Sequence, residues 1–115
     1  MFKTIFAEIY KKNADIECLG VWGKDGLELE KIIYSTHYSN IDLIGAEMAA
    51  ILSQIDTFNL TSDKFYLELS NGLFKVVIFS LTPDFFLLVF GKFGMITGKL
   101  RFYVDLIKPQ LNSFL

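Results

Sequence analysis

Cysteine, histidine, tryptophan and arginine each occur only once in these 115 residues. A single cysteine, Cys18, excludes an internal disulfide and favours a reducing, cytoplasmic location. One histidine, His37, and one cysteine are too few for a zinc site, so we expect no metal and no cofactor. A Cys18–His37 nucleophilic pair requires the fold to bring the two together, which the sequence does not show. This inventory points away from an enzyme.

Charge is also scarce, at 21% of residues against about 25% in a typical soluble domain. Eleven basic residues oppose 13 acidic ones for a net charge of -2, and no run of lysine or arginine occurs. Nucleic acid is therefore not expected as a partner, because neutralising phosphates needs a basic stripe. A mild basic bias near the C-terminus, which we interpret as a solvated helix face, comes from Lys92, Lys99, Arg101 and Lys108.

Apolar residues, by contrast, make up 52% of the chain and include 12 phenylalanines. No apolar run approaches the roughly 20 residues that span a bilayer, and Glu8 and Lys11 interrupt the N-terminal segment. We therefore expect neither a signal peptide nor membrane insertion. The apolar surplus instead indicates a surface buried between subunits, so self-association is the first expectation.

Hydrophobic periodicity predicts three helices and five strands. Asp25-Gly26 and Asn71-Gly72 each stand between two apolar runs, which is a strong signal for a β-hairpin. Consecutive hairpins pair their strands antiparallel. We expect helices at 2–12, 41–58 and from about 94, and strands at 16–23, 27–34, 64–70, 73–81 and 85–90. This is one α+β domain over residues 1–115, a five-stranded antiparallel sheet with flanking helices in the order α-β-β-α-β-β-β-α.

The central predicted helix has two different faces. The bulky face is expected to pack on the sheet; it comprises Ile44, Met48, Ile51, Leu52, Ile55 and Phe58. The opposite, small face comprises Gly45, Ala46, Ala49, Ala50 and Ser53. Small residues allow a second helix to approach closely, although alanine also suits a plain solvent-exposed surface. The apolar surplus favours the helix–helix contact.

The stretch "FFLLVFGKFGMITGKL" runs from an apolar strand straight into a helical pattern. We expect Gly91 and Gly94 to act as hinges at that sharp turn. Their G-K-F-G spacing matches neither phosphate-binding glycine motif, so nucleotide binding is not expected there. Pro109 should end or kink the last helix near Asp105 to Lys108.

Three segments, taken in order, resemble the Roadblock/dynein light chain family over nearly the whole chain. "IECLGVWGKDGLELE" resembles its first hairpin, and "AEMAAILSQI" resembles the alanine-rich part of its central helix. "FFLLVFGKFGMITGKLRFYVDLIKPQL" is similar to its last strand, glycine-containing loop and terminal helix. The phenylalanine content and Pro109 depart from the family pattern.

This resemblance implies a profilin-like layering and a homodimer, or a heterodimer with a related Roadblock-like subunit. Central helices would pack side by side and third strands would pair edge to edge, here through Ile41 to Phe58 and Lys64 to Ser70. Pairing would also cover a strand edge that otherwise risks aggregation. The expected dimer interface comprises Gly45, Ala46, Ala49, Ala50, Ser53, Phe65 and Leu67.

Family members act as adaptors or regulators of small Ras-like GTPases, or as dynein light chains. The leading hypothesis is therefore a non-enzymatic dimeric regulator or adaptor of such a GTPase. Arg101 belongs to the closing helix and is a poor candidate for an arginine finger, so any effect would act on the GTPase's own switch loops. The alternatives are a self-assembling scaffold subunit and, ranked last, a small-ligand sensor. Trp22 is interpreted as a packing residue, with a partner contact as the alternative.

Overall fold

A computed structural model describes residues 2–35, 40–57 and 65–115 of the chain. His37, Phe58 and Lys64, which entered the sequence predictions, lie outside this described part. The elements are α1 (Phe2–Lys12), β1 (Ile16–Gly23), β2 (Glu28–Ile33), α2 (Ile41–Thr57), β3 (Tyr66–Ser70), β4 (Phe74–Thr82), β5 (Phe85–Lys92) and α3 (Thr97–Asn112). The predicted α+β class and element order are confirmed.

The five strands form one antiparallel sheet in the order β2-β1-β5-β4-β3. Both predicted hairpin turns are present, and their glycines, Gly26 and Gly72, have φ values of 90° and 87°. Only glycine adopts this left-handed backbone at little cost, which explains the Asp-Gly and Asn-Gly pairs. The two hairpin units join where β1 pairs with β5, with Leu19 opposite Val89.

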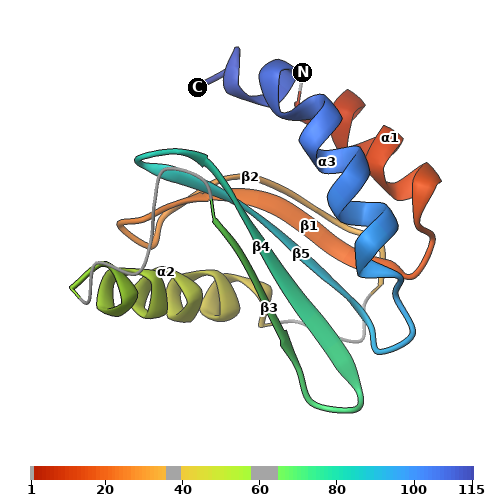
Figure 1. Ribbon diagram of the computed structural model, residues 1–115, viewed down its shortest axis with the longest axis horizontal. Helices are drawn as coiled ribbons and strands as arrows, with labels where there is room; N and C mark the ends of the chain where they lie inside the picture. The colour runs from red at the N-terminus through yellow and green to blue at the C-terminus, as the bar shows by residue number, and fades with distance from the viewer. Residues whose placement is uncertain (1, 36–39, 58–64) are drawn as a thin grey trace.

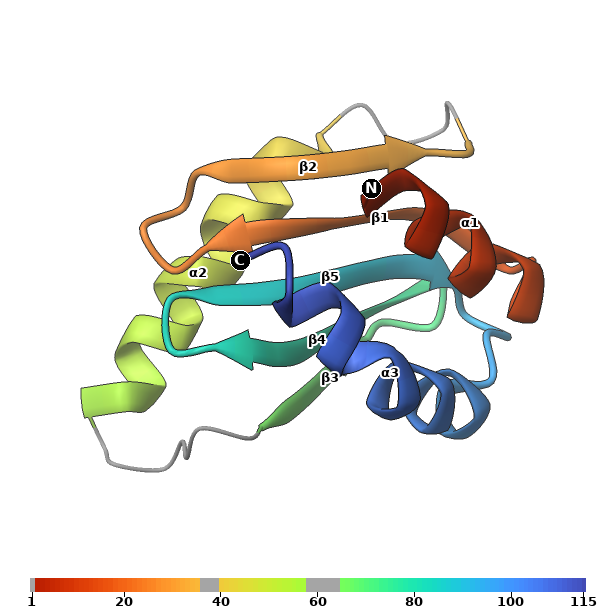
Figure 2. The same ribbon diagram turned by 90° about the horizontal axis from the view of Figure 1, so that it is seen from above.

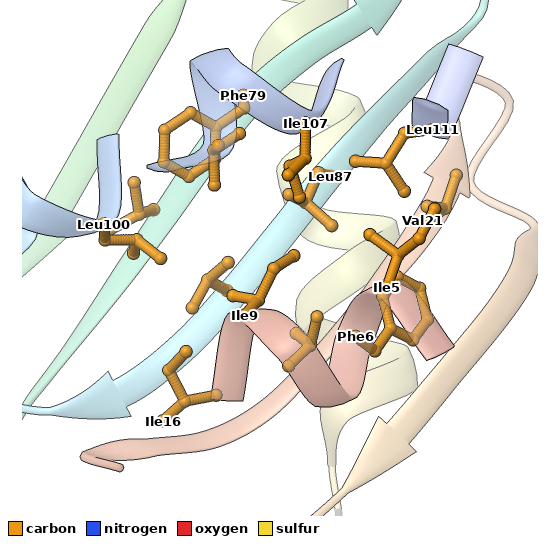
Figure 3. Packing of buried hydrophobic residues seen from close by; sticks show 14 of the residues in the cluster. Ile5, Phe6, Ile9, Ile16, Val21, Phe79, Leu87, Leu100, Ile107 and Leu111 are labelled. Atoms are coloured by element: carbon orange, nitrogen blue, oxygen red, sulfur yellow. The ribbon is translucent and has the colours of Figure 1, made fainter. Parts of the chain in front are cut away.

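The helices lie on both faces of the sheet, with α1 and α3 side by side on one face and α2 on the other (Figures 1 and 2). Apolar side chains from α1, α3 and the sheet form the larger core, in which Phe6 and Val104 are fully buried (Figure 3). A second core lies under α2, around the fully buried Trp22. Two cores on opposite faces explain why β1, β4 and β5 read as nearly continuous apolar runs.

In the last third of the chain, the structure corrects the prediction for two glycines and decides between the two outcomes predicted for Pro109. Among the described glycines, positive φ occurs only at Gly26 and Gly72, so Gly91 and Gly94 are not hinges of that kind. Gly91 lies within β5, where a Cβ would meet the carbonyl oxygen of Asp15 at 3.0 Å; close packing is why it is glycine. The last helix begins at Thr97 and continues through Pro109 to Asn112. The helix therefore does not end at Pro109, and its ribbon bends in its last turns (Figure 2), which agrees with the predicted kink.

Candidate protein interaction surface

Helix α2 turns part of its small face toward the sheet. Gly45 and Ala49 are buried within the chain, and a Cβ at Gly45 would lie 2.5 Å from Cε2 and 2.7 Å from Cδ1 of the Trp22 indole. The prediction that Gly45 and Ala49 face away from the sheet is therefore wrong. The reason is the size of Trp22, which fills the space under α2 and leaves room only for a residue without a side chain. Trp22 itself is a packing residue, as expected.

The other small residues, Ala46, Ala50 and Ser53, are exposed. The flank of α2 around Ala46 lies beside the β1–β2 hairpin, because a Cβ added at Gly26 would be 3.9 Å from Ala46 Cα. Two ion pairs tie α2 to the same hairpin, Lys31 with Asp42 at 2.5 Å and Lys24 with Asp56 at 3.9 Å. These small residues therefore face the side of α2 that is turned away from β3.

The opposite flank of α2 carries large apolar side chains that the chain covers only in part. At about 100° per residue, four half-buried residues fall on this flank; they are Ile44, Met48, Ile51 and Ile55. In Figure 2, the β1–β2 hairpin lies on one side of α2 and β3 on the other, so this flank faces β3. Of the five described residues of the predicted bulky face, only Leu52 is fully covered by the sheet, and the other four are half-buried.

Strand β3 is an outer strand of the sheet, and no described strand pairs with its second edge. Phe65 and Leu67 are half-buried against the core under α2, and Leu69 is 41% exposed. The strand carries only one charged residue, Glu68. The other outer strand, β2, has three charges among six residues. Charged side chains protect edges from pairing, so β3 is the less protected edge.

Together these residues form one apolar surface at the side of α2 next to β3, which we call the α2–β3 surface. It consists of Ile44, Met48, Ile51, Ile55, Phe65, Leu67 and Leu69. Only Phe65 and Leu67 were predicted from the sequence as interface residues. A signal for the missed ones was present: the large apolar residues from Ile51 round to Leu52, with Gly45 and Ala49 beside them, cover an arc of about 160° on α2, more than the roughly 100° that one buried face needs.

The end of α2 that lies against β2 is held by a charge cluster. Lys31 Nζ donates to Asp42 Oδ1 at 2.5 Å and lies 2.8 Å from Glu28 Oε1. The hydrogen bond from Lys31 lowers the pKa of Asp42, and the Asp42 bond raises the pKa of Lys31. Because Asp42 stands in the first turn of the helix, its negative charge also interacts favourably with the helix dipole. This cluster ties the first turn of α2 to β2.

The sequence offers two residues for nucleophilic catalysis, Cys18 and His37. Burial raises the pKa of the Cys18 thiol to about 12, which keeps the thiol protonated and unreactive at neutral pH. Its possible partner, His37, lies outside the described residues. No cluster of three potential metal ligands occurs in the part of the chain that the structure describes. Within the same residues, no helix has the length and apolar character needed to cross a membrane.

A groove of about 820 Å³ lies between α3 and the β3–β4 side of the sheet. Arg101 stacks over the Tyr66 ring there, 4.7 Å from its centroid, and Lys108 lies 3.7 Å from Asp105. Both cations therefore already have partners within the chain. This engagement agrees with the view of Arg101 as a poor arginine finger.

Comparison with known proteins identifies the fold. No protein-family model matches the chain, and no curated protein sequence does so either. MglC from Myxococcus xanthus is similar in structure, with a TM-score of 0.70 at 22% identity over 99% of this chain and 98% of that one. The gliding protein MglB from Thermus thermophilus gives a TM-score of 0.81 at 8% identity, over 96% of this chain and 85% of that one.

A Roadblock/LC7 domain from Streptomyces avermitilis gives a TM-score of 0.65 at 11% identity, over 91% of this chain and 92% of that one. Identities this low show the fold and nothing further. For the fold, the Roadblock resemblance inferred from the sequence is therefore confirmed.

Proposed function

We propose that this chain, which has the fold of Roadblock/LC7 domains, is a dimeric regulator or adaptor of a small Ras-like GTPase. It would act through protein contacts alone, as a homodimer or with a related Roadblock-like subunit. The observation that carries the proposal is the α2–β3 surface, where a half-covered apolar helix flank adjoins a little-protected strand edge. Such an arrangement suits a self-complementary contact in which the same patch serves both subunits.

In the proposed dimer, the β3 strands of two subunits pair antiparallel and extend the sheet across both. The two α2 helices then meet along the flanks that face β3, through Ile44, Met48, Ile51 and Ile55. Self-association is further supported by an MglB structure described as having a tetrameric arrangement, which matches this chain with a TM-score of 0.83 at 9% identity.

The proposed interface keeps Phe65 and Leu67 from the sequence prediction and replaces its helix residues. Ala46, Ala50 and Ser53 lie on the flank away from β3, and Gly45 and Ala49 are buried inside the subunit. In the interface predicted from the sequence, a charge at Ala50 would disrupt the dimer. In the interface proposed from the structure, a charge at the neighbouring residue Ile51 would do so. That difference makes the helix contact directly testable.

The first experiment measures solution mass by light scattering over about a hundredfold range of concentration. Wild-type protein should be a dimer, and Ile51→Glu should split it. An unpaired carboxylate in an apolar contact reduces the free energy of dimer formation by about 2 kcal/mol or more. Ala50→Glu adds the same charge one residue away and should leave the dimer intact. A dimer that Ala50→Glu splits and Ile51→Glu does not would instead place the contact on the small face. Wild-type protein that is monomeric at every concentration would refute the dimer model.

The GTPase partner rests on the Roadblock fold, so it needs its own test. Binding of small Ras-like GTPases, each in its diphosphate and triphosphate forms, should show a preference for one nucleotide state. A regulator without a catalytic residue must act by such differential affinity for the partner's two conformations. Failure to bind any of these GTPases would argue strongly against this role while leaving the dimer untouched.

The competing proposal is a scaffold subunit that assembles without a GTPase. Eleven large apolar side chains are exposed among the described residues, several of them far from the α2–β3 surface. Growth beyond a dimer with increasing concentration would favour the scaffold, and a constant dimer mass would weaken it.

A further inference from the structure

The helices on the two faces of the sheet carry opposite charge. In the layer formed by α1 and α3, six basic residues oppose two acidic ones, Glu8 and Asp105. Helix α2 carries three acidic residues and no basic one. Because the whole chain has a net charge of only -2, this separation of charge is a property of the fold and not of the composition. The α1–α3 layer therefore favours contact with an anionic surface.

The same layer exposes large apolar side chains on its outer side. Phe102 is 69% exposed and Leu106 is 62% exposed. They lie one helical turn apart on α3, on the side opposite the buried stripe that enters the core through Leu100 and Val104. Lys99 precedes Phe102 by three residues and is also exposed, so a cation and the two apolar side chains share one face of the helix.

Helix α1 carries three further exposed lysines, Lys3, Lys11 and Lys12. Lys12 lies on the side of α1 next to α3, near Tyr103, whereas Lys3 lies on the side next to β2, near Glu30. Their interactions within the chain are long and solvent-exposed. Lys11 is 3.9 Å from Glu8, Lys3 is 4.0 Å from Glu30, and Lys12 is 5.6 Å from the Tyr103 ring centroid. Exposed pairs of this kind contribute little to stability, so the lysines are available to another anion.

We propose that the α1–α3 layer is a docking surface for an anionic lipid membrane, with Phe102 and Leu106 entering the lipid interface. Apolar residues with lysines around them are typical of peripheral contact with anionic lipid, in which the chain lies on the bilayer and does not cross it. Lipid fits better than an acidic protein because Phe102 and Leu106 project from a convex helix. A protein partner would need a matching pocket, whereas the lipid interface accommodates projecting side chains without one.

The position of the layer is compatible with the proposed dimer. The α2–β3 surface lies on the other face and at the edge of the sheet (Figure 1). If two subunits continue one sheet through β3, both α1–α3 layers lie on the same face of that sheet. A dimer would then bind one membrane through two copies of the site, and its avidity would exceed the affinity of either copy. Lipid binding by a single subunit does not depend on the dimer.

The test is cosedimentation of the full chain with vesicles. Wild-type protein should pellet with vesicles of phosphatidylglycerol and phosphatidylcholine in equal parts, and about tenfold less with phosphatidylcholine alone. High salt should release it, because salt screens the lysines. The double variant Phe102→Ser/Leu106→Ser should lose about tenfold in affinity, because it removes the apolar side chains that enter the lipid. Leu27→Ser/Leu43→Ser changes two leucines that are 70% and 59% exposed outside this layer and should bind like wild type.

Circular dichroism of each variant checks that it is folded, as expected for substitutions of exposed side chains. Wild-type protein that stays in the supernatant with the mixed vesicles would overturn the proposal. Equal losses of vesicle affinity in the two double variants would also overturn it, because the α1–α3 layer would then have no special role in lipid binding. If the protein does not bind vesicles but binds poly-L-glutamate through Phe102 and Leu106, the partner of this layer is an acidic polypeptide and not a membrane. None of these results bears on whether the chain forms a dimer or binds a GTPase.

Discussion

Replacing Gly45 by alanine tests the rotation of α2 about its own axis. If Gly45 faced solvent or a second helix, the substitution would only improve helix formation within the subunit, by about 1 kcal/mol. In the structure, the new methyl group would instead approach two atoms of the buried Trp22 indole to 2.5 and 2.7 Å. The same substitution thus has opposite expected effects on stability in the two orientations.

The size of the effect follows from how little Trp22 can move. Its side chain is fully buried, with β5 paired to its strand on one side and β2 on the other. Overpacking of a core costs about 1–3 kcal/mol, and an overlap with a rigid, enclosed ring belongs near the upper end. After subtracting the gain in helix preference, Gly45→Ala should lose about 2 kcal/mol of unfolding free energy.

Gly98→Ala in α3 is a matched control, because nothing lies within 4 Å of the position that its Cβ would take. It should be neutral or gain up to about 1 kcal/mol. Urea unfolding followed by the fluorescence of Trp22, the only tryptophan, measures both variants. All proteins are compared at one concentration, since the apparent stability of a dimer depends on concentration. A Gly45→Ala variant as stable as wild type would refute the packing of Gly45 on Trp22.

Two further predictions concern titration. Because burial raises the Cys18 pKa from 9.0 to about 12, the folded protein should not react with a thiol reagent at neutral pH, whereas the unfolded chain should. Above pH 9.0 the unfolded thiol ionises while the folded one does not, so stability should fall as the pH rises, and Cys18→Ala should reduce this fall. Asp42→Asn should cost less than about 1 kcal/mol near pH 7, as for other exposed ion pairs. The lowered pKa of Asp42 stabilises the fold above its ordinary value of 3.8, so the difference between Asp42→Asn and wild type in urea unfolding should vanish as the pH falls below that value.

Local features were predictable from the amino-acid sequence alone. The Asp25-Gly26 and Asn71-Gly72 turns and the order of the elements follow from short-range patterns. Turn glycines and periodic apolar residues act within a few positions of one another, so no knowledge of distant contacts is needed. The same is true of the antiparallel pairing within each hairpin.

The orientation of α2 depends on residues that are far apart in the chain. Its small residues and its large apolar residues are both compatible with a buried face, and helical spacing does not say which face meets the sheet. That choice is made by Trp22, on a strand whose place beside β5 arises from pairing between the two ends of the chain. The indole occupies the volume under Gly45, α2 rotates to accommodate it, and Ile44, Met48, Ile51 and Ile55 are left partly exposed toward β3. The interaction surface is therefore a consequence of tertiary packing, because only packing decides which apolar side chains a single subunit leaves uncovered.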